Sequence, residues 1–340
     1  MTYLIFSLYT LLCLVVIPRY MKSAFLFFIS IGLIFFSGLR YESGIDYFNY
    51  LNLYNASYYA STEYLYWFIS IIHKNTLNSF PLFIFMISFV SIAIKLYVLD
   101  RSSENVFVSV FVFICISYIY VDMGFIRNSI SLSFFMLSFL MYSKDDKWYA
   151  FFFFFVSFLF HHSVIFMAYL FLLRPSSKGQ VSQLYLVLLL ACMLIACFDL
   201  PREILALSES LSFLPHYITW KLNFYLNNVQ YENLGINIYN VRYFILSLFF
   251  YYFQGVIKKS FLIKLYILGS CLILLLGFNV QFYSRVGIYT AFFEVLLISG
   301  FSYHFTGKNR LLFMFFLTIF YGVLFSRTSY IMGINSVVIL

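Results

Sequence analysis

Charged and aromatic side chains gather in four short segments of an otherwise apolar chain, the first being GLRYESGIDYFNY, residues 38–50. It offers a guanidinium group, carboxylates and phenols within a few residues, and Gly44 permits a sharp turn. Guanidinium groups bind phosphate and phenols contact sugar rings, so this composition suits a site for a phosphorylated sugar. A solvated connection between helices is the structural alternative. The candidate residues are Arg40, Asp46, Tyr47 and Tyr50.

The second segment is MGFIRNSIS, residues 123–131, in which Arg127 interrupts a long apolar stretch. A charge at the centre of a bilayer costs at least about 2.5–3.5 kcal/mol. We therefore expect Arg127 at the tip of a helical hairpin, where its side chain reaches water and Asp122 lies close enough to pair with it. Such a pair is the structural explanation, and substrate binding is the functional one.

The third segment, SFLFHHSVIF (residues 157–166), carries His161 and His162 at a turn between two short apolar helices. Imidazole has an ordinary pKa that suits proton transfer near neutral pH, which makes His161 a candidate general base. A hydrogen-bonded interfacial histidine is the alternative. No metal site is expected, because neighbours on a helix point about 100° apart and no third ligand follows at a suitable spacing.

The fourth segment, residues 278–294, has Arg285 at the outer end of an apolar stretch and Tyr289 one helical turn further. Glu294 lies inside a predicted span, where a lysine partner, a protonated carboxyl or a place in a cavity would each explain it. The sequence contains no P-loop, dinucleotide, zinc-protease or serine-hydrolase motif. This argues against those chemistries, and no cofactor is expected.

The chain around these segments has the composition of a membrane protein. Its 340 residues are 63% hydrophobic and only 10% charged, whereas soluble domains are about 45–50% apolar and about one quarter charged. The apolar runs are continuous, so they predict helices. The fold class is therefore all-α, a polytopic membrane protein with one integral domain over residues 1–340. The twelve predicted spans are residues 2–17, 24–39, 80–98, 106–122, 128–142, 148–160, 163–173, 182–198, 240–257, 262–280, 286–301 and 311–326.

Alternation of these spans assigns each loop to one side of the membrane. Basic residues first occur after the first span, which favours an outer N-terminus. Most of the 21 Lys and Arg residues, Lys95 among them, then fall on the inner face, and the four segments fall on the outer face. This positive-inside bias accounts for the net charge of +8, so no nucleic-acid partner is expected.

Three other features have structural interpretations. Residues 63–74 are apolar but too short to cross, so they predict an interfacial or re-entrant helix on the outer side. Residues 199–239 form the larger outer loop. The acidic pair Asp145 and Asp146 lies between lysines and predicts a solvated turn on the inner side. The five cysteines all lie in apolar stretches and are interpreted as small buried hydrophobic residues.

The order of these motifs resembles that of a known family. The run Arg40-x-x-x-Gly44-x-Asp46-Tyr47-x-x-Tyr50 resembles the signature of the EpsG-like branch of Wzy-type polysaccharide polymerases. The later motifs of that family fall at Ile126-Arg127-Asn128, at Phe160-His161-His162-Ser163 and at Arg285-x-x-x-Tyr289. The resemblance covers roughly residues 25–300, and its elements share one predicted side of the membrane.

The resemblance implies an activity at the periplasmic face of the bacterial inner membrane. Such enzymes join undecaprenyl-pyrophosphate-linked repeat units into O-antigen or related polysaccharide, without a metal or cofactor. By this resemblance, three arginines would meet at the diphosphate, tyrosines would contact sugar, and an Asp or a His would be the base. The partners would be the lipid-linked oligosaccharide, the bilayer and a chain-length regulator. The residues concerned are Arg40, Arg127 and Arg285, then Tyr47, Tyr50 and Tyr289, and then Asp46 or His161.

Two other classes of protein remain as alternatives. A flippase or transporter for lipid-linked sugars would show internal repeats or helices broken at the midplane, but the chain has 5 Pro and no visible repeat. A membrane acyltransferase would carry an Arg-rich first span, which residues 1–17 lack. An O-antigen ligase would carry its key histidine in one large outer loop, and His216 keeps that possibility open.

Overall fold

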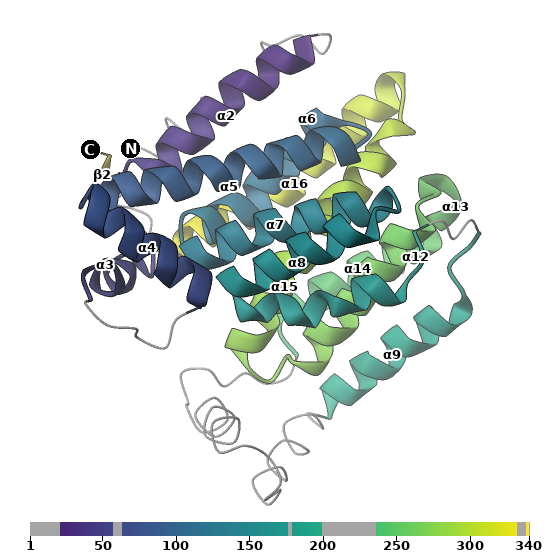
Figure 1. Ribbon diagram of the computed structural model, residues 1–340. Helices are drawn as coiled ribbons and strands as arrows, with labels where there is room; N and C mark the ends of the chain where they lie inside the picture. Colours follow the sequence, from purple (N-terminus) through teal and green to yellow (C-terminus); the bar gives the residue numbers. More distant parts are fainter. Residues whose placement is uncertain (1–20, 57–62, 176–178, 199–235, 332–337, 340) are drawn as a thin grey trace, which may run out of the picture. The chain divides into compact units, whose positions relative to one another are not determined.

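The computed structural model describes residues 21–56, 63–175, 179–198, 236–331 and 338–339. Within these ranges nearly every segment is helical (Figure 1), which confirms an all-α protein. Contacts divide the chain into two compact units, residues 1–165 with 298–340 and residues 166–297. One integral domain over the whole chain stays a prediction.

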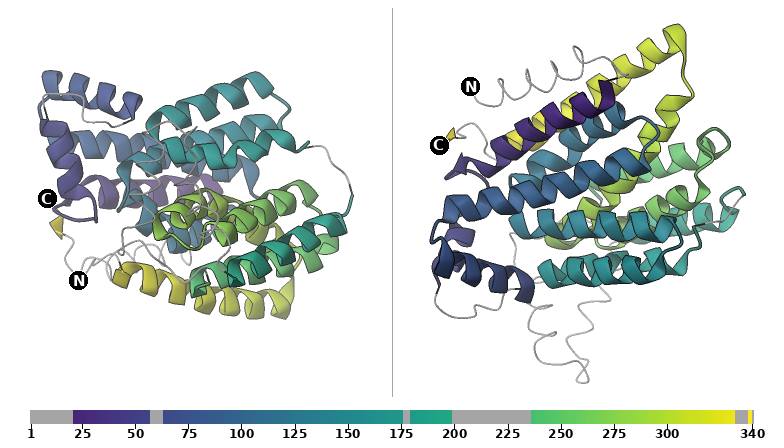
Figure 2. Two further views of the ribbon diagram at one scale, coloured as in Figure 1. Left: turned by 90° about the horizontal axis from the view of Figure 1, so that it is seen from below. Right: turned by 45° about the horizontal axis from the view of Figure 1, so that its top comes forward.

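The first unit contains most of the candidate residues. In it α7 packs against α8 and α5, and α5 packs against α2 (Figure 2). The end of α15 (Val280–Tyr303) and the start of the 3-10 helix η3 (His162–Leu172) also belong to it. Its other elements are α2 (Lys22–Gly38), β1 (Arg40–Tyr41), α3 (Tyr47–Asn55), α4 (Tyr64–Thr76), α5 (Phe80–Ser102), α6 (Val106–Phe113), the π-helix η2 (Ile114–Asp122), α7 (Ile126–Ser143), α8 (Lys147–Phe160), α16 (Gly307–Ile331) and β2 (Val338–Ile339).

In the described part of the chain, the second unit contains the rest of η3 and α15 and four further helices. In it α14 packs against α9 and against α12. The four helices are α9 (Gln183–Cys197), α12 (Ile238–Tyr252), α13 (Gln254–Ile257) and α14 (Ser260–Leu275).

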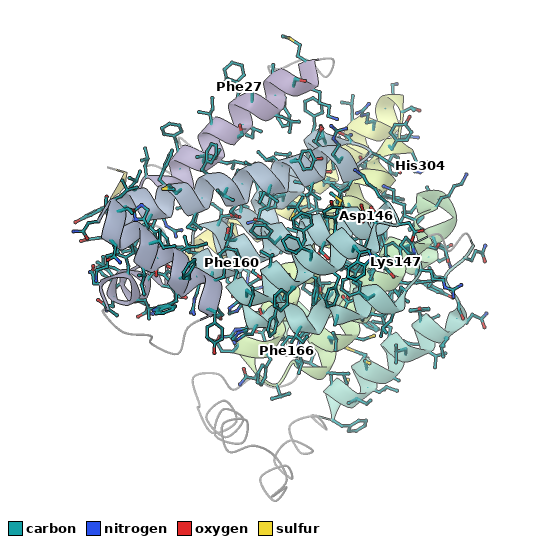
Figure 3. The ribbon with its side chains drawn as sticks, viewed as in Figure 1. Phe27, Asp146, Lys147, Phe160, Phe166 and His304 are labelled. Carbon is teal, nitrogen blue, oxygen red and sulfur yellow. The ribbon has the colours of Figure 1, made fainter. Side chains whose placement is uncertain are left out.

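A hairpin of α7 and α8 places the third segment beside the second. Small hydroxyl side chains let the two backbones approach closely, with the Ser131 and Ser157 Oγ atoms 2.9 Å apart. Asp146 and Lys147 lie at one end of α8 and Phe160 lies at the other (Figure 3). The predicted acidic turn at Asp145 and Asp146 is confirmed. The opposite end of the hairpin brings the start of α7 next to the end of α8.

One predicted span is wound in two ways. Residues 106–122 begin as α6, whose first turn is capped by the Asn105 side chain accepting from the Val108 N–H. They continue as the π-helix η2, which ends with the Met123 N–H donating to the Tyr118 carbonyl at 3.2 Å. π-Helical turns are rare and occur frequently at functional sites. The uniform apolar sequence gives no sign of this change.

Three helices in the described part of the chain are long and apolar enough to cross a membrane. These are α5, α15 and the Gly307–Arg327 part of α16, and several shorter apolar helices accompany them. Every predicted span after the first overlaps a helix, whereas residues 2–17 lie outside the described residues. The number of crossings therefore stays a prediction. The short helix predicted over residues 63–74 is confirmed as α4. Most of the larger loop, residues 199–235 with His216, lies outside the described residues.

Candidate active site

Three residues far apart in the sequence meet at the ends of α4, α7 and α8. Glu63 immediately precedes α4, Arg127 lies in the first turn of α7, and His161 immediately follows α8. Each oxygen of the Glu63 carboxylate has its own partner. Oε2 accepts a hydrogen bond from Nη1 of Arg127, and Oε1 lies 2.6 Å from Nδ1 of His161. One carboxylate thus joins a cation to an imidazole.

The Glu63 carboxyl is ionised at neutral pH. Burial alone would raise its pKa, since only 9% of the side chain is exposed. The hydrogen bond from His161 and the positive charge of Arg127 outweigh burial and lower the pKa of Glu63 to about 2. An ionised carboxylate can only accept hydrogen bonds, so the proton between it and His161 belongs to Nδ1.

Two buried phenol rings lie beside this cluster. The guanidinium carbon of Arg127 lies 5.5 Å from the centroid of the Tyr50 ring, and the ring of Tyr66 lies 5.8 Å from that of Tyr50. Burial raises the pKa of both tyrosines. Both phenols therefore stay neutral at neutral pH and are excluded as general bases.

The turn after α2 is built around Gly44 and Arg40, and the sharp turn expected at Gly44 is confirmed. Gly44 has a φ of +102°, and a Cβ atom there would overlap the carbonyl oxygen of Met123. Arg40 is 1% exposed, and its Nη1 donates to the carbonyl of Asp122 at 2.8 Å and to that of Met123. The turn is thereby fixed to the link between η2 and α7, just before Arg127.

The other candidates lie at the start of α3 and differ in their exposure. Asp46 is half-buried, and its Oδ1 accepts from the side chain of Asn49 at 3.2 Å. Tyr47 is 3% exposed and packs edge-to-face on Phe80, while Tyr50 is 2% exposed. Such burial leaves these two rings little surface for a sugar, so the structure assigns them to packing around the site.

The expected pair between Asp122 and Arg127 is wrong. Asp122 instead lies 2.6 Å from the ammonium group of Lys95, and both side chains are buried. Ser129 also donates to Asp122, at 2.6 Å. The π-helix directs Asp122 toward α5, away from Arg127. Lys95 is therefore enclosed among helices and does not lie on an inner surface as its loop assignment implied.

The fourth segment belongs to the second unit. Arg285 is half-buried and donates from Nη2 to the Gln281 side chain at 3.2 Å, one turn earlier on α15. Tyr289, one turn later, is completely buried, so its ring has no surface for a sugar. The expectation that Arg285 meets Arg40 and Arg127 at one diphosphate stays a prediction.

Glu294 has a cationic partner that the sequence analysis did not consider. Its carboxylate accepts from Nη2 of Arg242 on α12 and lies 3.2 Å from the hydroxyl of Tyr266. Glu294 is completely buried, and a buried carboxylate with a charged partner and a hydroxyl donor has a structural explanation. The suggested lysine partner is thus replaced by an arginine.

A comparison with known protein families gives a match that includes every candidate residue described above. Residues 23–338 match the EpsG family. The chain belongs to the EpsG family. These are Wzy-type polymerase-like proteins, as the motif resemblance predicts. No curated protein and no solved structure matches the chain.

In this EpsG-family protein the residue that sequence reasoning missed is Glu63. It is separated by 64 residues from Arg127 and by 98 from His161, so no local motif contains the three. One signal was available: Glu63 is a lone acid at the start of an apolar helix. Within the described ranges, no group of three His, Cys, Asp or Glu side chains could hold a metal ion.

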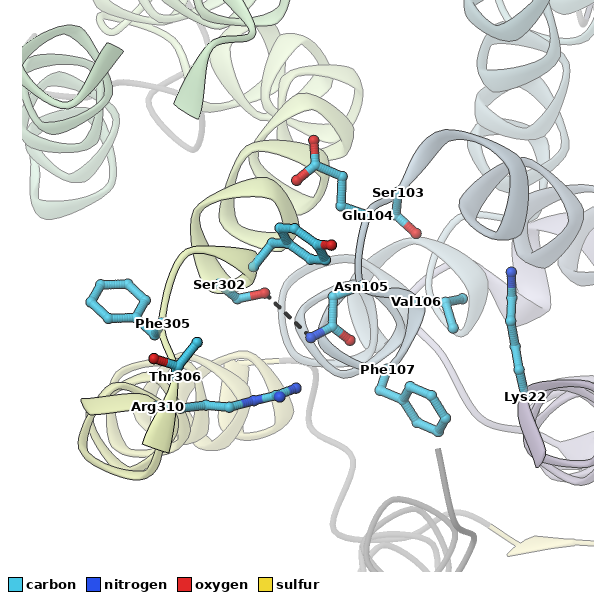
Figure 4. A pocket seen from close by; sticks show the side chains of 11 residues that line it. Lys22, Ser103, Glu104, Asn105, Val106, Phe107, Ser302, Phe305, Thr306 and Arg310 are labelled. Carbon is cyan, nitrogen blue, oxygen red and sulfur yellow. Dashed lines mark hydrogen bonds between the residues drawn. The ribbon is translucent and has the colours of Figure 1, made fainter. Parts of the chain in front are cut away.

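A cavity of 520 Å³ in the first unit of the EpsG-family protein lies apart from this cluster. Its walls come from the α5–α6 and α15–α16 connections, where Asn105 donates to Ser302 at 3.4 Å and Arg310 extends along one side (Figure 4). Helix α5 begins at Phe80, beside Tyr47, and ends at Ser102, beside the cavity. The cavity is therefore at the far end of α5 from the candidate site.

Proposed function

We propose that this protein is a polysaccharide polymerase, a membrane glycosyltransferase that extends a lipid-linked glycan. The growing chain would leave undecaprenyl pyrophosphate and join the non-reducing end of the next lipid-linked repeat unit. Membership of the EpsG family and the apolar helices support the proposal. The observation that carries it is the placing of Arg127 and His161 on one carboxylate, because a cation and a base are the groups this transfer requires.

The chemistry explains why these groups are needed. A hydroxyl oxygen of the acceptor forms a bond to the anomeric carbon of the donor, whose bond to the diphosphate oxygen breaks. The electron pair of that bond passes to the diphosphate, and the hydroxyl proton passes to a base. Arg127 and Arg285 would stabilise the developing charge without a metal, each guanidinium–phosphate contact contributing about 1.5–3 kcal/mol. Asp46 and His161 are the two candidate bases.

The buried residues have supporting roles in this proposal. Arg40 holds the turn that precedes Arg127, since its guanidinium is buried against main-chain carbonyls. Tyr50 lies against Arg127, and Tyr289 lies one turn from Arg285. The sugar would then be bound by the exposed edge of the cluster, where His162 and Asp46 have accessible surface.

The proposal includes the cellular location of the protein and the side of the membrane that its active site faces. The active site would face the periplasm at the bacterial inner membrane, with the prenyl tails of both substrates between helices. A chain-length regulator is the proposed protein partner. The positive-inside distribution of Lys and Arg supports this orientation.

Deletion of the gene tests the proposal. On a gel, the surface polysaccharide of the deletion strain should collapse from a ladder to a single repeat unit. Loss of every repeat would indicate a flippase or a ligase instead. Complementation with Arg127→Ala, Arg285→Ala or His161→Ala should leave the single repeat. The matched control, Arg101→Ala, changes an exposed arginine at the far end of α5 and should restore the ladder. Full ladders from all the site variants would contradict the assignments.

A further inference from the structure

The contacts of Glu63 decide between the two candidate bases. His161 and Glu63 are both buried, with side chains 10% and 9% exposed, and Nδ1 of His161 lies 2.6 Å from Oε1 of Glu63. The second oxygen, Oε2, is bound to Arg127. The carboxylate is therefore held from both sides, and it fixes the orientation of the imidazole ring.

This contact also sets the tautomer of the ring. Glu63 is ionised because its pKa lies at about 2, so Nδ1 of His161 carries the shared hydrogen. In the neutral ring the lone pair then belongs to Nε2. A carboxylate that orients a histidine and stabilises its protonated form is a recurrent device of proton-transfer catalysis.

We propose that Glu63 is the positioning residue that makes His161 the general base of the transfer. The inference rests on the proposed function. Nε2 of His161 is itself buried, so the acceptor reaches it once the side chains that cover the imidazole move aside. In the step, Nε2 takes the proton of the acceptor hydroxyl while that oxygen bonds to the anomeric carbon. The bond from that carbon to the diphosphate breaks, and the diphosphate leaves with the electron pair beside Arg127. Glu63 stays ionised throughout and stabilises the imidazolium ring that forms.

Asp46 lacks an equivalent arrangement. Asp46 immediately precedes α3, and its Oδ1 accepts a hydrogen bond from Asn49 in the first turn of that helix, at 3.2 Å. Among the described residues no ion pair joins this carboxylate to a cation. By contrast, the Glu63–His161 pair connects directly to Arg127, so the base and the cation share one fixed support. The geometry therefore favours His161.

The charged and titratable groups around His161 come from α3, α4, α7 and the start of η3. Glu63 faces it from the start of α4, and Arg127 faces the same carboxylate from α7. Tyr50 on α3 and Tyr66 on α4 face Arg127 and remain neutral. His162, the next residue, is exposed. Loss of the Glu63 charge thus removes the carboxylate that contacts His161 and stabilises its protonated form.

The test measures the pH dependence of chain elongation. Membranes of the deletion strain, which would accumulate the lipid-linked repeat unit, serve as the substrate for purified protein in vesicles. Glu63→Gln should lower the elongation rate by about 100-fold or more. The acid limb of its pH–rate profile should move to lower pH by about one unit, because the protonated imidazole loses its negative partner. Asp46→Asn should leave that limb where the wild type has it.

A matched control and a second variant separate a positioning role of Glu63 from a structural one. Glu104→Gln makes the same change at an exposed residue at the far end of α5 and should leave the profile unchanged. If Glu63→Gln does not fold, His161→Gly takes its place, and imidazole in the buffer should restore its elongation. A slower Glu63→Gln with an unmoved acid limb, or a folded His161→Gly that imidazole leaves inactive, would overturn the proposal. An inactive wild type would instead refute the polymerase function itself.

Discussion

The ammonium group of Lys95 lies 2.6 Å from the carboxylate of Asp122, and both side chains are enclosed by helices of the first unit. Ser91 and Ser129 lie around the pair, with Lys95 donating to the Ser129 hydroxyl at 3.0 Å. The main-chain carbonyl of Asp122 accepts from Arg40 at 2.8 Å. A buried charge pair therefore joins α5 to the end of η2, at the residue whose carbonyl holds the Arg40 turn.

Removing either member of this pair should destabilise the protein strongly. Lys95→Met or Asp122→Asn leaves a buried charge without its partner, which costs about 3–5 kcal/mol. The double variant should recover much of this loss, since no lone charge remains. Thermal unfolding of the four proteins in detergent measures the coupling. Additive losses would show that the two charges do not interact.

Gly44→Ala should destabilise the turn that carries Arg40. A φ of +102° costs an alanine about 1–3 kcal/mol, and its Cβ would also overlap the Met123 carbonyl. Gly322→Ala on α16 is the matched control, because a Cβ there meets nothing within 4 Å. That control should be neutral or stabilising by up to about 1 kcal/mol. Equal melting temperatures for both variants would refute this account of the turn.

Arg40→Lys tests whether Arg40 acts as a support. Both carbonyls accept from one nitrogen, Nη1, and the compact ammonium on the differently shaped lysine stem does not place its donors at that position. Stability should therefore fall by about 1–3 kcal/mol. Elongation should fall with it, through a smaller folded fraction and a displaced Arg127. A variant with unchanged melting temperature and a raised KM would show instead that Arg40 binds substrate.

The contribution of Glu63 to stability should depend on pH in a defined direction. Its pKa falls from the ordinary value of 4.5 to about 2 on folding. The stabilisation, on the order of 3 kcal/mol, is therefore complete above pH 4.5 and is lost as the pH falls toward 2. The difference in melting temperature between the wild type and Glu63→Gln should shrink over that window. A constant difference would contradict the assigned pKa.

Sequence alone predicts the elements of this fold better than their contacts. Continuous apolar runs locate the helices, and Gly44 locates the turn, because these signals are local. Glu63 and Arg127 meet only through tertiary packing, 64 residues apart, and no periodicity encodes such a meeting. Proximity along the chain is the available guide for Asp122, and it favours Arg127 as the partner. The backbone winding before it directs the carboxylate elsewhere.

That winding sets the rotational register of everything downstream. A π-helix has one more residue per hydrogen-bonded loop than an α-helix, so η2 carries one residue that a regular helix of the same rise would not accommodate. If all nine residues of Ile114–Asp122 were wound as a regular α-helix, the extra residue would swing the C-terminal end of the segment by about 100°. The carboxylate would leave α5, and the carbonyls that hold Arg40 would turn with it. The winding of this one segment thus keeps the Lys95–Asp122 pair in phase with the cluster of Glu63, Arg127 and His161.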